Sequence, residues 1–99
     1  MFQRIRDRQR DLGIIAKFRT RMKLQQSLSF RDTNRAMSYW DEELIAMAAI
    51  QAKVEVPDFD GMALGDGTII QAIIDFFKSE AGQKLIDAIV QLLLSLIGT

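Results

Sequence analysis

Two apolar segments near the C-terminus constrain the fold most, because their polar residues fall on different faces. In residues 69–78 the polar positions are Gln71, Asp75 and Lys78, and in residues 84–97 they are Lys84, Asp87, Gln91 and Ser95. On one straight helix, at about 100° per residue, these two polar stripes would lie on nearly opposite sides. A single helix would then have no consistent face toward water. The pattern therefore predicts two amphipathic helices with a turn or sharp kink between them.

The residues at the joint support a break near Ser79. Ser79 is followed by Glu80, which matches a helix N-cap with an acidic residue in the first turn. Gly82 adds backbone freedom at the joint, and Gly98 is placed to end the second helix. We expect a C-terminal helical hairpin or kinked pair.

The same segments do not predict a membrane crossing. A spanning helix needs about 20 mainly apolar residues. The longest uncharged run, residues 88–99, has 12 residues and includes Gln91 and Ser95. A span that began at residue 69 would bury five charged side chains, each of them costly in hydrocarbon.

The rest of the chain also has helical periodicity. In residues 2–24, a loose apolar stripe consists of Phe2, Ile5, Leu12, Ile15, Phe18 and Met22. Residues 25–37 carry turn-forming residues and predict a connector, with an extended piece at 27–30. Asp32 or Ser38 is the expected N-cap of the next helix, which is predicted from residue 38. Its core-facing stripe would consist of Trp40, Leu44, Met47, Ile50 and Val54.

The expected fold is all-α, a small bundle of three to four amphipathic helices. Their predicted ranges are about 3–24, 38–54, 69–78 and 80–97. A loop containing Pro57 and three glycines separates the second from the third. Residues 1–37 form a basic N-terminal helix or arm with its connector, and residues 38–99 form an acidic and apolar helical region, within a single structural unit.

The residue types argue against catalysis. The chain has no Cys and no His, so the commonest general base, triad partner and metal ligand are missing. Asp58, Asp60 and Asp66 accompany glycines, but their spacing does not fit a calcium-binding EF-hand loop. The glycine-rich segment also lacks the Lys of a phosphate-binding loop. We therefore expect a protein that is not an enzyme, with no catalytic residues, cofactor or metal.

The charges are strongly segregated, although they sum to zero. Residues 1–40 contain ten Arg and Lys against three Asp, a net charge of +7, and residues 41–99 carry −7. The basic residues expected to bind a partner are Arg4, Arg6, Arg8, Arg10, Lys17, Arg19, Arg21 and Lys23. A basic amphipathic helix suits an acidic protein surface, nucleic acid or an anionic membrane surface. Pairing with the chain's own acidic half is the other interpretation.

The C-terminal helices have apolar arcs wider than a surface helix of a monomer needs. The apolar residues expected at an interface are Ile69, Ile73, Phe76, Phe77, Leu85, Ile89, Leu92, Leu93 and Leu96. Two interpretations are open at this point. One is a central core helix, and the other is burial against another copy, another protein or a lipid interface.

These features favour a non-enzymatic structural or adaptor subunit of a larger assembly. It would form homo-oligomers through the apolar C-terminal helices and bind a protein partner through the basic arm. A phage or virus particle is one setting for such a chain, and the expected location is cytoplasmic or virion, since the N-terminus has no recognisable signal peptide. The alternatives are a peripheral membrane-surface protein and a nucleic-acid-binding protein that uses the Arg-rich arm.

Overall fold

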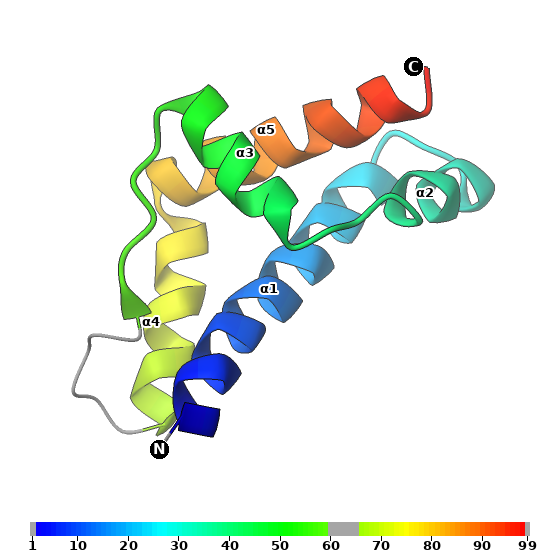
Figure 1. Cartoon of the computed structure of the whole chain (residues 1–99). Coiled ribbons are helices and arrows are strands. Elements are labelled where there is room, and N and C mark those ends of the chain that lie inside the picture. Colours follow the sequence, from blue (N-terminus) through cyan, green and yellow to red (C-terminus); the bar gives the residue numbers. More distant parts are fainter. Residues whose placement is uncertain (1, 60–65, 99) are drawn as a thin grey trace.

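Helices make up the regular structure of the described part of the chain, which confirms the all-α prediction. The computed structural model describes residues 2–59 and 66–98, and the side chains of residues 10–59 and 69–98. The helices are α1 (Phe2–Gln25), α2 (Phe30–Met37), α3 (Glu43–Ala52), α4 (Asp66–Lys78) and α5 (Glu80–Leu96) (Figure 1). Five helices stand where three to four were predicted. The additional one, α2, lies in the segment expected to be a connector.

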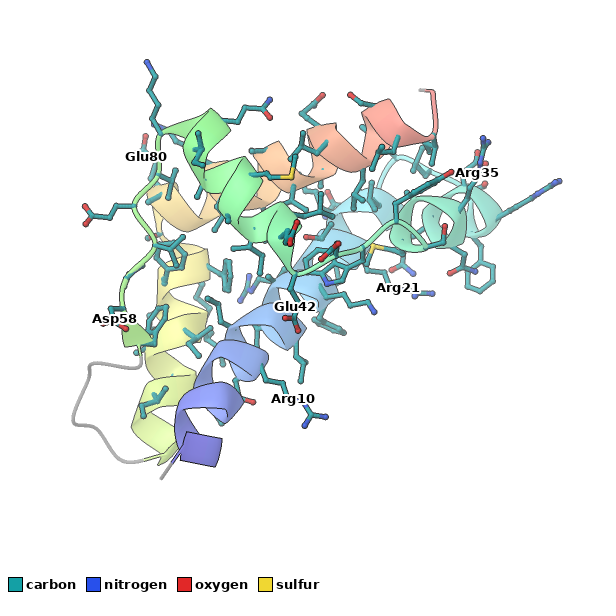
Figure 2. All side chains as sticks on the ribbon, viewed as in Figure 1. Arg10, Arg21, Arg35, Glu42, Asp58 and Glu80 are labelled. Carbon is teal, nitrogen blue, oxygen red and sulfur yellow. The ribbon has the colours of Figure 1, made fainter. Side chains whose placement is uncertain are left out.

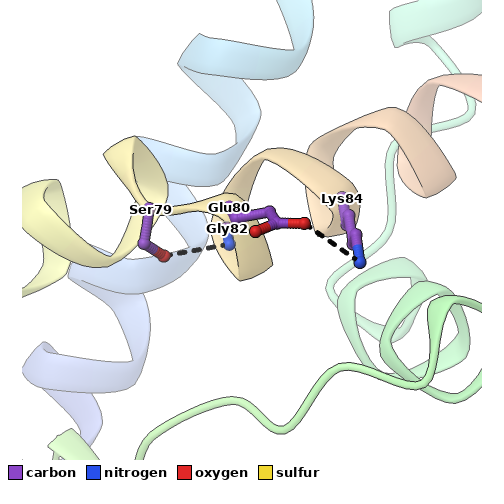
Figure 3. A network of polar contacts seen from close by, with 4 residues as sticks. All are labelled: Ser79, Glu80, Gly82 and Lys84. Carbon is purple, nitrogen blue, oxygen red and sulfur yellow. Dashed lines mark hydrogen bonds and ion pairs between the residues drawn. The ribbon is translucent and has the colours of Figure 1, made fainter.

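The predicted break at Ser79 is confirmed. The Ser79 side chain caps α5 by accepting a hydrogen bond from the Gly82 backbone N–H at 3.2 Å (Figure 3). Its hydroxyl also donates to the Phe76 carbonyl at 2.5 Å, so one side chain ties the end of α4 to the start of α5. The chain turns a sharp corner here, and α5 leaves in a new direction (Figure 1). Glu80 and Lys84 form an exposed ion pair one turn apart, at 3.4 Å.

Gly82 lets the two helices meet closely at this corner. A Cβ placed on Gly82 would collide with the Phe76 carbonyl oxygen and would lie only 2.5 Å from the Phe77 Cα. The absence of a side chain therefore brings the first turn of α5 against the backbone of α4. Sequence reasoning gave Gly82 the role of a flexible joint, whereas the structure uses it for close packing.

α5 is the central helix of the bundle. It packs against α1, α2, α3 and α4, and seven of its residues are buried. They are Gly82, Leu85, Ile86, Ala88, Ile89, Val90 and Leu93. Four neighbouring helices thus cover most of the wide apolar arc of α5. Among the described residues, no helix combines the length and the apolarity that a membrane crossing requires.

The prediction of a connector with an extended piece at residues 27–30 was wrong. Ser29 is the N-cap of α2 and accepts a hydrogen bond from the Asp32 N–H at 3.1 Å. Thr33, Ala36 and Met37 are buried at spacings of three and four, so α2 has a core-facing side. Ser29, a residue type that favours turns, is here the N-cap of a short helix.

The predicted start of the next helix at Ser38 was also wrong. Ser38 is the C-cap of α2, and α3 starts at Glu43, whose N–H donates to the Asp41 carboxylate at 3.1 Å. The predicted core stripe is correct for Leu44, which is buried, and for Trp40 and Val54, which are partly buried against the core. Met47 and Ile50 are exposed. The inner face of α3 combines Leu44 with the small residue Ala48, and α3 packs mainly on α5.

In α1, the buried row also consists largely of small residues. Ala16, Thr20 and Leu24 are fully buried, at spacings of four. Phe18 and Met22, which belong to the loose apolar stripe predicted in residues 2–24, are exposed. α1 packs against α2, α4 and α5, so its described part belongs to the bundle and does not form a separate arm.

Candidate interaction surface on α1

An exposed apolar row runs along the outer side of α1. Ile14, Phe18 and Met22 follow one another at spacings of four, which places them on a single face of the helix. Their side chains are 55%, 63% and 50% exposed. We call these three residues the α1 ridge. Exposed apolar residues scattered singly are normal, but a continuous row with a polar border indicates a binding surface.

Cations border the α1 ridge. Arg10, Lys17 and Arg21 lie on one flank by helical position, and Arg19 lies on the other. Arg10 projects from α1 away from the bundle (Figure 2). The Arg21 guanidinium donates to the Asn34 side-chain carbonyl on α2 at 2.7 Å and is therefore held in place.

Three of these cations are not neutralised in the described part of the chain. Arg10, Lys17 and Arg19 have no ion-pair partner among the described residues. Lys23, by contrast, is 3.5 Å from the Asp87 carboxylate on α5, with both side chains at least half exposed. Within the described residues, an acid from the chain's acidic half thus neutralises Lys23. The charges of Arg10, Lys17 and Arg19 remain available for a partner beside the ridge.

A groove lies beside the end of α1 nearest the corner. It has a volume of about 410 Å³, and its lining residues come from α1, α4 and α5. They are Arg19, Met22, Lys23, Gln26, Phe77, Lys78, Gln83, Ile86 and Asp87. Three cations face one acid across this groove. Met22 belongs to both the ridge and the groove, so the two form one continuous surface of apolar and basic character.

A second hollow adjoins the other end of the ridge. Its volume is about 460 Å³, and it lies between α1 and the segment that leads into α3. The lining residues are Arg10, Gly13, Ile14, Lys17, Trp40, Asp41 and Glu42. Glu42 lies at the start of α3 (Figure 2). The acids at the start of α3 therefore share a hollow with two cations of α1.

The structure brings together only part of the predicted basic set. Arg10, Lys17 and Lys23 are exposed, whereas Arg19 and Arg21 are half-buried. The side chains of Arg4, Arg6 and Arg8 lie outside the described residues. Arg19 and Lys23 meet Phe77, a residue of the predicted apolar set, at the groove.

The predicted apolar interface needs correction, because the structure uses most of it as the core of the same chain. Six of its residues are buried within the bundle, namely Ile69, Ile73, Phe77, Leu85, Ile89 and Leu93. Phe76 and Leu92 are partly buried and pack against that core. Leu96 is 51% exposed. Of the two interpretations left open, the central core helix explains these residues, since four neighbouring helices surround α5.

Sequence reasoning missed the α1 ridge because α1 has two possible inner faces. One row holds Phe18 and Met22, and the other holds Ala16, Thr20 and Leu24. Hydrophobicity favours the first row, but small residues allow the second to approach α4 and α5 closely. The signal in the sequence that could have identified the inner face was the spacing of four between the small residues Ala16 and Thr20.

The surface contains groups suited to binding. Guanidinium and ammonium groups attract anions, while the phenyl and thioether side chains offer apolar contact. Within the described residues, no three potential metal ligands cluster together. Asp60, one of the acids considered for calcium, lies outside the described residues.

Comparison with known proteins adds no relative: the chain matches no protein-family model, no curated protein and no solved structure.

Proposed function

We propose that this chain is a non-enzymatic structural or adaptor subunit that binds a protein partner through the α1 ridge and the adjoining groove. The observation that carries the proposal is the exposure of Ile14, Phe18 and Met22 beside cations that have no ion-pair partner among the described residues. The partner surface that fits is a helix with apolar residues in the middle and acidic residues at its edge.

The composition of the surface supports a protein partner. Aromatic residues, Met and Arg are enriched in protein interfaces, and these residue types gather here. A partner that covers Phe18 removes a large apolar area from water, which favours binding by about 25 cal/mol for each Å² of apolar surface buried. The bordering cations then increase the association rate and select acidic partners. In this form of the proposal, α1 replaces the C-terminal helices as the binding element, because α5 is covered by the other helices of the same chain.

The two other functions are outcomes of the same test. A peripheral membrane protein would insert the α1 ridge between lipids while its cations contact anionic headgroups. A nucleic-acid-binding protein would stack bases on Phe18 and contact phosphates through the same cations. The three alternatives differ in the chemical class of molecule that touches position 18.

Site-specific photo-crosslinking can identify that class. A photo-reactive phenylalanine analogue replaces Phe18 in the full-length chain, in the cells that naturally produce it. The control carries the same analogue at Gln91, which is exposed on α5 and is not part of the ridge. Adducts are separated by mass and by their sensitivity to protease, nuclease and lipid extraction.

A discrete protein adduct from position 18 that is absent from position 91 is the expected result. Adducts with lipid or nucleic acid, or equal protein adducts from both positions, would refute a protein-docking role for the α1 ridge.

A further inference from the structure

A second unpartnered apolar face lies on α3. Met47 is 53% exposed and Ile50 is 80% exposed, the highest fraction among the large apolar residues described as exposed. Glu43 and Ala46 are also exposed and lie on the same face, since the four residues are three or four positions apart. We call Glu43, Ala46, Met47 and Ile50 the α3 patch.

The charge of the α3 patch is opposite to that of the α1 ridge. Asp41, Glu42 and Glu43 are exposed at the start of α3. Among the described residues, Glu42 and Glu43 have no ion-pair partner. The chain thus presents a basic apolar face and an acidic apolar face, each with unmatched charge. The α1 ridge belongs to residues 1–40, which carry a net charge of +7, and the α3 patch belongs to residues 41–99, which carry −7.

The residue spacings of the two faces are also compatible with helix packing. The α1 ridge is a row of side chains at spacings of four. The α3 patch contains two such rows, Glu43–Met47 and Ala46–Ile50, and the small side chain of Ala46 adds little bulk to the second row. Packing one row of this type into the groove between two others is the commonest helix contact in globular proteins, with axes crossing at about 50°.

We propose that the partner on the α1 ridge is the α3 patch of a second copy of this chain. This inference rests on the proposed protein-docking function of the ridge. Ile14, Phe18 and Met22 of one copy pack between the two rows of the other copy. The cations beside the ridge then face the acids at the start of the second copy's α3.

The location of the two faces allows this contact to form twice. Ile14 of the ridge and Glu42, the neighbour of the patch residue Glu43, line the same hollow. One end of the ridge therefore lies close to the start of α3, where the patch begins. A two-fold axis near the hollow would pair each ridge with the other copy's patch. A contact made of one or two helix pairs is small, so we expect dissociation constants on the order of 10 μM.

Sedimentation velocity of the full chain over a range of concentrations tests the proposal. The ridge variant is Phe18→Glu, which places a negative charge against an acidic patch. The patch variant is Ile50→Lys, which places a positive charge against a basic ridge. The matched control is Phe30→Glu, the same chemical change at a comparably exposed position, the first residue of α2. Circular dichroism checks that each variant keeps its helices.

We expect wild type and Phe30→Glu to associate equally, and each of the other two variants to bind itself more than about tenfold more weakly. An equimolar mixture of Phe18→Glu and Ile50→Lys should associate again, because one chain retains an intact patch and the other an intact ridge. The association of wild type should weaken between about 50 mM and about 500 mM salt, since the charges are exposed.

A wild-type chain that stays monomeric, a Phe18→Glu variant that associates like wild type, or a mixture that does not recover would each overturn the second-copy proposal. The result is separable from the proposed function. If the chain is monomeric but position 18 crosslinks to a protein of different mass, only the second-copy proposal fails. Lipid or nucleic-acid adducts would remove both.

Discussion

Replacing Gly82 by Ala tests whether the corner between α4 and α5 depends on backbone contact. The new Cβ would collide with the Phe76 carbonyl oxygen and lie 2.5 Å from the Phe77 Cα, where ordinary contacts begin at 3.4 Å. The first turn of α5 must therefore move away by about 1 Å. The Phe76 carbonyl cannot yield easily, because it accepts hydrogen bonds from both the N–H and the hydroxyl of Ser79.

The magnitude follows from two opposing effects. Overpacking of this kind destabilises by about 1–3 kcal/mol. Ala favours a helix over Gly by up to about 1 kcal/mol, and less near a helix end. We expect Gly82→Ala to lower the free energy of unfolding by about 2 kcal/mol, which corresponds to a fall in Tm of about 10 °C for a domain of this size.

Gly13→Ala is the matched control, because a Cβ there meets nothing within 4 Å and Gly13 lies inside α1. That variant should gain about 0.5–1 kcal/mol from helix preference alone. Urea unfolding monitored by circular dichroism measures both values. If Gly82→Ala were as stable as wild type, or if the two variants changed stability in the same direction, the close-packing explanation of the corner would be wrong.

Three further substitutions test local features of the fold. Ser79→Ala should cost about 1 kcal/mol, because the cap on the Gly82 N–H is lost; an unchanged urea midpoint would show that the cap contributes nothing. Thr33→Val should raise the free energy of unfolding by about 1 kcal/mol, because the buried Thr33 hydroxyl has no hydrogen-bond partner within the described part of the chain. A lower Tm in calorimetry would contradict this. Lys53→Gly should raise the free energy of unfolding by about 1 kcal/mol, because Lys53 ends α3 in the left-handed conformation with φ 56°, which Gly adopts without strain. A lower free energy of unfolding in urea would show that Lys53 is not strained there.

The sequence predicted correctly those features whose signals lie within a few neighbouring residues. The displaced polar stripes and the Ser79 cap act within one or two turns, so the break between α4 and α5 could be read without knowledge of the tertiary structure. α2 was missed because Ser29 and Asp32 favour a turn and a helix N-cap equally. What decides between these is the burial of Thr33, Ala36 and Met37 against the rest of the bundle, which is a tertiary effect.

The candidate surface was predicted in its charge and not in its apolar residues. The sequence showed a basic N-terminal segment, and Arg19 and Lys23 do line the groove. It did not show that Phe18, Met22 and Ile50 would face outward, since by hydrophobicity each belongs in a core. Small residues at Ala16 and Ala48 bring their helices closer to the bundle than those larger side chains could.

The sequence by itself determined the helical class, the corner at Ser79 and the separation of charge, because each depends on residues near one another along the chain. Only the tertiary structure decided which face of α1 and α3 turns inward and whether the apolar arc of α5 is covered. Those outcomes depend on how closely helices from distant parts of the chain can approach, and a one-dimensional pattern of apolar residues does not contain that distance.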